Sequence, residues 1–173
     1  CGCSACVQRC PKQCIALKED EEGFLYPMVD EEMCVNCGLC EKVCPILNQA
    51  PKIQPQEVLA VKNPDEEERM ASSSGGVFLP LAREVLRKGG VVFGAVYDKQ
   101  WEVHHVYAEK IEDVYTMMGS KYLQSRIENT YREAETFLKQ GREVMFVGSP
   151  CQIAGLRTFL KNKEYPNLLA VDF

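Results

Sequence analysis

The sequence has few of the features that mark membrane or nucleic-acid-binding proteins. None of its hydrophobic runs approaches the roughly 20 residues that a membrane-spanning helix needs. Lys and Arg number 20 against 25 Asp and Glu, without a basic cluster, and the net charge of −5 argues against a nucleic-acid partner. Hydrophobic residues are nevertheless 46% of the chain, which excludes extensive disorder and predicts a folded globular protein.

Cysteine is the residue in excess, and it is unevenly distributed. Nine of the ten cysteines lie within the first 44 residues, and the other is Cys151. This contrast predicts two modules of different kinds. A polar segment with spaced prolines, residues 47–56, is the expected linker between an N-terminal module at 1–46 and a second module at 57–173.

The N-terminal module contains an internal repeat with a period of 34 residues. The second copy is complete and reads Cys34-x2-Cys37-x2-Cys40-x3-Cys44-Pro45. In the first copy, the equivalents of its last three cysteines are Cys3, Cys6 and Cys10. The equivalent of Cys34 would precede residue 1, so we expect the chain to be a piece of a longer protein, with Cys1 as an alternative ligand.

This spacing is typical of proteins that hold two [4Fe–4S] clusters. The first three cysteines of each copy converge on one cluster, and the fourth, before the proline, binds the other. The pattern therefore predicts one cluster on Cys10, Cys34, Cys37 and Cys40. It predicts a second cluster on Cys3, Cys6, Cys44 and either the preceding cysteine or Cys1.

Structural zinc and a disulfide framework are the alternatives to clusters. Zinc sites usually show two cysteine pairs split by a longer spacer, and disulfides need an oxidising compartment and explain neither Cys-Pro step. Cys14 fits no ligand position, so we expect it to be a small buried hydrophobe. Strands at 15–17 and 24–29 complete an α+β module that resembles the bacterial two-cluster ferredoxins.

The second module alternates helical and strand-like patterns, which predicts an α/β domain with a mixed sheet. Short apolar runs at 58–61, 91–97, 103–108, 144–147 and 168–173 have the strand pattern. Helical patterns cover 77–88, 110–118, 129–140 and 150–162. Adjacent strand residues face opposite sides of a sheet, so we expect His104 and His105 to have structural roles rather than to share a site.

Three loops of the second module could each bind a cofactor. Ser72–Gly76 precedes a helix and offers N–H groups and hydroxyls to a phosphate, although a plain helix cap is the alternative. Residues 119–125 combine a cation, an aromatic ring and hydrogen-bond donors, with a polar edge strand as the alternative. Residues 148–152 join a strand to a helix, where Ser149 and Pro150 suit the cap and first position, and Cys151 is either a reactive or an inert thiol.

These loops together resemble the beta subunits of coenzyme F420-reducing hydrogenase and F420-dependent formate dehydrogenase. The matching motifs, which also include Gly90–Ala95, run in the family's order from about residue 57 to the end. The resemblance implies a flavin, usually FAD, and a domain that continues past residue 173. It assigns to the flavin pocket Ser73, Ser74, Gly75, Gly76, Gly119, Ser120, Lys121, Tyr122, Gln124, Gly148, Ser149, Pro150, Cys151 and Gln152.

The sequence thus predicts an iron–sulfur flavoprotein oxidoreductase. Two [4Fe–4S] clusters would exchange electrons with a flavin, and the flavin would exchange a hydride with F420 or another substrate. The alternative is an electron-carrier or assembly subunit without flavin. We expect a redox protein or a small hydride donor or acceptor as partner, membership of a larger complex, and, because the thiols must stay reduced, a cytoplasmic location.

Overall fold

The computed structural model describes residues 2–51 and 54–173. The N-terminal module comprises α1 (Ala5–Arg9), an antiparallel hairpin of β1 (Ile15–Glu19) and β2 (Leu25–Val29), and α2 (Leu39–Lys42). Gly23, at φ +85°, lies in the turn that joins the two strands, where a side chain would be strained. The strand–turn–strand prediction for this segment is confirmed.

The second module is built on a four-stranded mixed sheet with the order β4-β3-β5-β6. Its strands are β3 (Val91–Tyr97), β4 (Val103–Ala108), β5 (Val144–Gly148) and β6 (Leu168–Asp172). β4 runs antiparallel to β3, whereas β5 and β6 run parallel to it. The predicted class, a ferredoxin-type module followed by an α/β domain with a mixed sheet, is confirmed.

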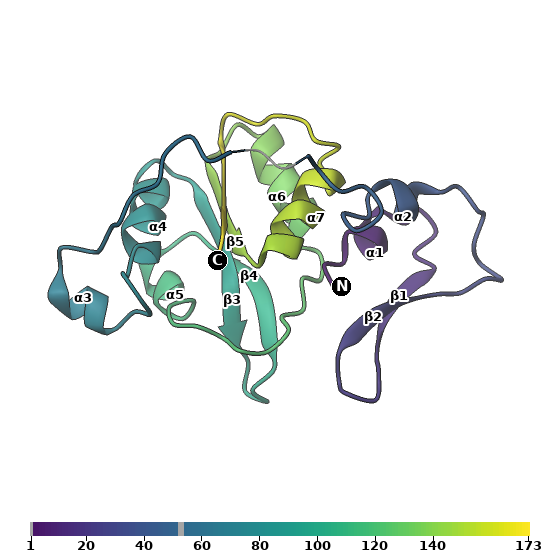
Figure 1. The fold of residues 1–173 in the computed structure, drawn as a ribbon, viewed down its shortest axis with the longest axis horizontal. Coiled ribbons are helices and arrows are strands. Elements are labelled where there is room, and N and C mark those ends of the chain that lie inside the picture. Colours follow the sequence, from purple (N-terminus) through teal and green to yellow (C-terminus); the bar gives the residue numbers. More distant parts are fainter. Residues whose placement is uncertain (1, 52–53) are drawn as a thin grey trace.

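Helices cover both faces of this sheet (Figure 1). On one face, α4 (Phe78–Arg87) and α5 (Ile111–Tyr115) pack over buried residues that include Val92 and Met145. On the other, α6 (Thr130–Lys139) and α7 (Pro150–Phe159) pack over Phe93 and Phe146. Because successive strand residues point to opposite faces, the near-continuous apolar runs of β3 and β5 supply both layers at once.

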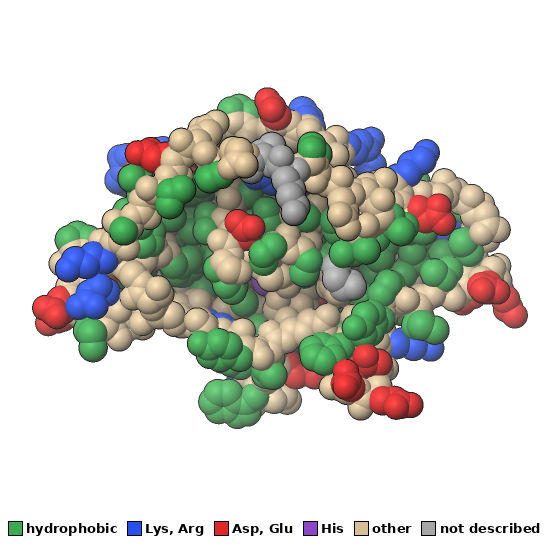
Figure 2. Space-filling view, in the orientation of Figure 1, with side chains coloured by type: hydrophobic (Ala, Val, Ile, Leu, Met, Phe, Trp, Pro, Cys, Tyr) green, Lys and Arg blue, Asp and Glu red, His purple; other side chains and the backbone are tan. Residues whose placement is uncertain are grey.

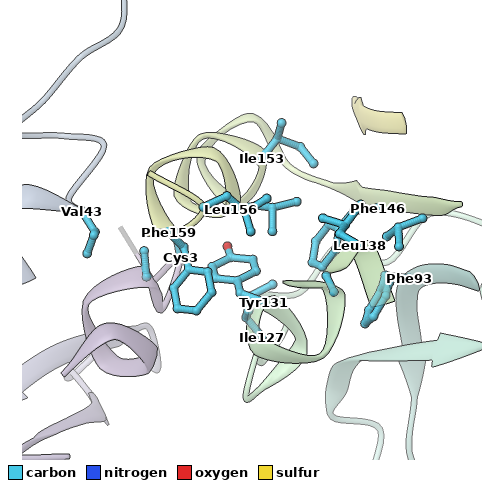
Figure 3. Close-up of a cluster of buried hydrophobic side chains, with 14 of the residues drawn as sticks. Cys3, Val43, Phe93, Ile127, Tyr131, Leu138, Phe146, Ile153, Leu156 and Phe159 are labelled. Atoms are coloured by element: carbon cyan, nitrogen blue, oxygen red, sulfur yellow. The ribbon is translucent and has the colours of Figure 1, made fainter. Parts of the chain in front are cut away.

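The N-terminal module shares the second of these cores. Cys3, Ala5 and Val43 belong to the same buried cluster as Tyr131 and Leu156. Figure 3 shows Cys3 beside Phe159 and Tyr131, with Val43 beyond Cys3 on the same side of the cluster. The two modules are therefore packed as one structure, despite the polar linker between them.

Hydrogen bonds reinforce this packing, and the most informative come from the buried side chain of Gln8. Its Oε1 accepts from the backbone N–H groups of Tyr131 (3.1 Å) and Arg132 (3.3 Å) in the first turn of α6. The residue at the N-cap of that helix, Asn129, makes no side-chain cap. A side chain from the other module thus caps α6, and the Arg132 guanidinium donates to the carbonyl oxygen of Gln8 in return.

Three further contacts bridge the modules. Gln124 Oε1 accepts from the N–H of Leu25 at 2.7 Å, and the Gln124 amide donates to the carbonyl of the same residue. Thr158 Oγ1 donates to the carbonyl oxygen of Val43 at 2.6 Å. Arg126 pairs with Glu19 at the end of β1. These contacts fix the hairpin and the end of α2 to the second module, and Gln8 does the same for α1.

One expectation about local structure is wrong, and one helix was not predicted. The apolar run at 58–61 forms no strand, and Val58 is 82% exposed, because the run has no neighbouring strand to pair with. Conversely, the patterns did not indicate α3 (Glu66–Met70), although Asp65 signals its start by accepting from Glu68 N. In the described residues, no helix is both long and apolar enough to cross a membrane.

We predict that Gly155→Leu destabilises the protein by about 1–3 kcal/mol, because it overpacks the junction between the modules. A Cβ at this position would lie 3.0 Å from both the Cys3 Sγ and the Tyr131 hydroxyl. Helix propensity alone would predict the opposite effect on stability, since replacing glycine inside a helix normally stabilises the helix. Arg157→Leu, at an exposed position of α7, is the matched control and should change the free energy of unfolding, measured by chemical denaturation, by less than about 0.5 kcal/mol.

Candidate functional site: two cysteine sites and a cavity

One cysteine site, here called the outer site, lies where α1, β1 and the segment before α2 meet. A cavity of about 230 Å³ is lined by Cys10, Cys34, Cys37 and Cys40. These are the four residues predicted to hold one cluster, and soft thiolates are suited to iron–sulfur clusters or zinc. Cys37 is exposed, so the outer site reaches the protein surface.

Cys14 also lines the outer site. It is buried, and its Sγ lies 3.4 Å from the Sγ of Cys10. The expectation of a small buried side chain agrees with this burial. The contact with Cys10 was not expected, because Cys14 falls outside the repeat.

The other cysteine site, the inner site, comprises Cys3, Cys6 and Cys44. Cys3 is buried against α7, and burial raises the pKa of its thiol, to which the nearby thiols of Cys6, Cys151 and Cys44 add. Burial likewise raises the pKa of Cys6, with Cys44 among the further causes. The three predicted ligands therefore lie near one another, and Cys151 lies near them. Cys1, the alternative fourth ligand, is outside the described residues.

A cavity of about 490 Å³ opens at the carboxyl ends of β3, β5 and β6, beside the inner site. Figure 2 shows hydrophobic side chains gathered around the hollow in this face of the molecule. Ligands of open α/β sheets commonly bind at this edge. Residues from all three predicted loops line the cavity: Ser73, Ser74, Gly76, Gly119, Ser120, Lys121, Gln124, Ser149, Cys151 and Gln152.

The first two loops are joined directly, since the N–H of Ser120 donates to Ser73 Oγ at 3.0 Å. The first loop does not cap α4 with a serine, however. The N-cap is Val77, which offers no side-chain acceptor. Gly76, at φ +66°, turns the chain into this helix, and Val77 and Phe78 at its start line the cavity.

Lys121, the cation that the second loop offers, is bound by the protein backbone. Its ammonium donates to the carbonyl oxygens of residues at the end of α5, namely Thr116, Met117, Met118 and Gly119. Burial lowers its pKa. The side chain lines the cavity, but its ammonium is held by backbone oxygens. Lys121 therefore stabilises the loop that carries those oxygens.

The third loop forms the cap that the sequence predicted. Ser149 is the N-cap of α7, Pro150 occupies the first turn, and Gln152 Oε1 accepts from Ser149 N at 2.9 Å. Cys151 lies in the first turn with its Sγ 3.3 Å from Ser149 Oγ. The start of α7 therefore faces the cavity, while Gly155, further along the same helix, contacts Cys3.

Four of the residues assigned to the pocket are not among its lining. Tyr122 is 92% exposed and lies on the outer side of its loop. Gly75 packs against the backbone, where a Cβ would lie 2.7 Å from the Val61 carbonyl oxygen. Gly148 and Pro150 hold the strand–helix turn without lining the cavity. Gly75, Gly148 and Pro150 shape the loops without lining the cavity, and Tyr122 is exposed to solvent.

Sequence reasoning missed most of the apolar lining and one polar group. The apolar residues come from α4, the segment after α5 and β5, whose patterns indicated only core positions: Phe78, Leu81, Met117, Met118, Met145 and Val147. The polar group is His105, which lines the cavity and is only 3% exposed. His104 lies on the opposite face of β4, beside the carboxylates of Glu128 and Asp98. The prediction that the two histidines do not share a site is confirmed.

Comparison with known proteins agrees with this two-part structure. Residues 1–47 match the family model described as a 4Fe-4S dicluster domain. Over 170 residues the chain is 25% identical to a subunit of the F(420)H(2) dehydrogenase of Methanosarcina mazei, covering 93% of this chain and 48% of that protein. The predicted resemblance to F420-linked beta subunits is confirmed. The N-terminal module is an iron–sulfur module.

Two further comparisons extend to the second module. The coenzyme F420-dependent sulfite reductase of Methanocaldococcus jannaschii is 27% identical over 158 residues, which cover 90% of this chain and 24% of that protein. A chain of the F420-reducing [NiFe] hydrogenase complex of Methanosarcina barkeri superposes with a TM-score of 0.50 at 22% identity, over 64% of this chain and 41% of that one, which shows a shared fold. The chain spans half or less of the length of these curated relatives.

We predict that Cys37→Ser loses about half of the bound iron, because it removes one ligand of the outer site and leaves the inner site intact. Iron and acid-labile sulfide per chain, measured on anaerobically purified protein, check this. Cys14→Ser is the matched control in the same cavity and should keep the full iron content. Unchanged iron in Cys37→Ser, or equal losses in both variants, would contradict the ligand assignment.

A second prediction concerns His105. Burial lowers its pKa to about 4, although the hydrogen bond to the Val147 carbonyl acts in the opposite direction. The unfolded chain binds a proton on this group below about pH 6.5, so stability should fall as pH drops from there towards 4, by about 2 kcal/mol at pH 5. Chemical denaturation of wild type and His105→Phe at pH 7 and pH 5 should give a smaller pH effect in the variant. Equal pH effects would contradict the lowered pKa.

Proposed function

We propose that this chain is an iron–sulfur flavoprotein oxidoreductase, acting as a subunit of a larger F420-linked or related redox complex. Its two cysteine sites would hold [4Fe–4S] clusters, and its large cavity would hold a flavin, with FAD favoured by the family resemblance. The hydride partner of that flavin is proposed to be F420 or another small molecule. Relatives named for F420 chemistry support this choice.

The observation that carries the proposal is the position of the large cavity. Three loops that the sequence singled out separately contribute to one space of about 490 Å³, within the usual range for cofactor sites. The same space borders Cys151, whose thiol is close enough to Cys3 to raise its pKa. A carrier protein without flavin has no need for such a cavity beside a cluster site.

The lining residues fit the two chemical halves of a flavin nucleotide. Methionine, leucine and phenylalanine side chains from α4, β5 and the segment after α5 give an apolar wall suited to a planar ring system. The first turn of α4 suits a phosphate, because its N–H groups have no acceptor within their own helix. In the first turn of α7, Pro150 has no N–H and the Gln152 N–H donates to the Ser149 carbonyl oxygen, which leaves the Cys151 N–H for a ligand. Ser73 and Ser149 add hydroxyl groups next to those turns. This combination is what a dinucleotide with an aromatic end requires.

The two cysteine sites differ in their surroundings, which suggests a path for electrons along the molecule. The outer site includes the exposed Cys37, whereas the inner site includes the buried Cys3 next to α7. Bound clusters supply one-electron transfer, and a bound flavin couples it to hydride transfer. The protein residues bind these groups, orient them and exclude water from the inner site. An external redox partner would thus dock near the outer site.

Anaerobic analysis of bound cofactors tests the proposal. We expect about eight iron, eight sulfide and one flavin per chain, from two four-iron clusters and one occupied cavity. The same iron and sulfide with no flavin, even after incubation with excess FAD, would refute the flavoprotein and favour the electron-carrier alternative. Zinc in place of iron would refute both the flavoprotein proposal and the electron-carrier alternative.

Lys121→Ala should weaken FAD binding by about tenfold or more. Four backbone oxygens lose their shared donor, and the cost of leaving them unpaired loosens the loop that carries Gly119 and Ser120. The measurement is FAD affinity by fluorescence titration, with the iron content as a check on the rest of the structure. Lys139→Ala, on the exposed side of α6, is the control. Equal FAD affinity in Lys121→Ala would remove this residue from the proposed site.

A further inference from the structure

His105 is the buried polar group of the large cavity that the proposed function leaves unused. It projects from β4, lines the cavity and is 3% exposed. Its ring stacks on Phe146, with centroids 5.6 Å apart and an interplanar angle of 13°. Its backbone N–H donates to the carbonyl oxygen of Arg126 at 2.9 Å, which fixes the strand at this position. The imidazole therefore has a defined location and plane.

The hydrogen bonding of the ring determines which nitrogen carries the proton. Nε2 lies 2.9 Å from the carbonyl oxygen of Val147. A carbonyl oxygen only accepts, so Nε2 must be the donor. Burial lowers the pKa of His105 to about 4, so the ring is neutral at pH 7 and Nδ1 carries a bare lone pair.

This Nδ1 lone pair has no hydrogen-bond partner among the described residues. Leaving a buried acceptor unpaired is costly, so such groups are normally paired with protein, water or a ligand. The side chain of Gln152, which also lines the cavity, is already engaged. It uses its Oε1 on Ser149 N and its Nε2 on Ser125 Oγ at 2.7 Å. Because the residue lines the cavity, a molecule held there is the candidate donor for Nδ1.

We propose that His105 is a ligand-binding residue whose Nδ1 accepts a hydrogen bond from an N–H group of a planar nitrogen heterocycle held in the large cavity. The inference rests on the proposed function and deepens it, since a flavin ring carries an imide N–H. The neutral imidazole with its proton fixed on Nε2 selects a donor and disfavours a bare acceptor at the same place. Ring systems without an N–H on that edge should bind more weakly.

The test compares FAD affinity in wild type, His105→Phe and His105→Asn, with His104→Gln as the control. His105→Phe keeps an aromatic ring against Phe146 and loses the acceptor, so we expect FAD to bind about tenfold more weakly. His105→Asn retains an acceptor oxygen near the Nδ1 position and should recover part of that loss. His104→Gln, on the opposite face of β4, should bind FAD as wild type does.

Nitrogen-15 NMR of the wild-type chain gives an answer that does not depend on a variant folding. The chain has two histidines, so both rings can be followed. The Nδ1 resonance of His105 should begin at the position of an unprotonated nitrogen and shift when FAD is added, while the His104 resonances stay in place. FAD binding without a shift, together with wild-type affinity in His105→Phe, would overturn this inference and leave the flavin site standing. Failure of the wild-type chain to bind FAD would overturn both.

Discussion

The structure depends on the burial of the N-terminal module against α6 and α7. Cys3 and Ala5 belong to the core of the second module, and the Gln8 side chain caps α6. Together they bring the Cys3 thiol into contact with Gly155 of the helix whose first turn lines the large cavity. Any substitution that separates α1 from α7 would disturb the inner cysteine site and the cavity together.

This packing gives the two cysteine sites different surroundings within one motif. The repeat makes them nearly equivalent in sequence, but only the inner site is enclosed by the second module, whereas the outer site keeps an exposed cysteine. The asymmetry arises because the N-terminal module packs its inner site, not its outer site, against α7. The Thr158–Val43 hydrogen bond fixes the end of α2 to that helix. Under the proposed function, this arrangement would connect the surface with the cavity as an electron relay.

Much of the fold could be predicted because its signals are local. Cysteine spacing predicted which cysteines lie together, and apolar runs with intervening helical patterns predicted each strand of the main sheet. The loop at Ser149 was recognisable as a cap because capping chemistry acts over a few residues. The strand expected at 58–61 does not form, because a strand also needs a partner strand beside it. A local apolar run gives no information about such a partner.

The rest depends on contacts between distant residues. Gln8 caps a helix that is far away in the sequence, and the engagement of Lys121 by four carbonyls depends on how α5 ends. His105 looked structural because neighbouring strand residues face opposite ways, and its position at the cavity became visible only with β5 and α7 in place.

An anaerobic crystal structure with bound FAD would show whether the cavity and the cysteine sites form one relay. We expect the flavin ring in the large cavity, bordered by Cys151, with clusters on both cysteine sites; a flavin bound elsewhere, or an inner site without a cluster, would contradict the relay.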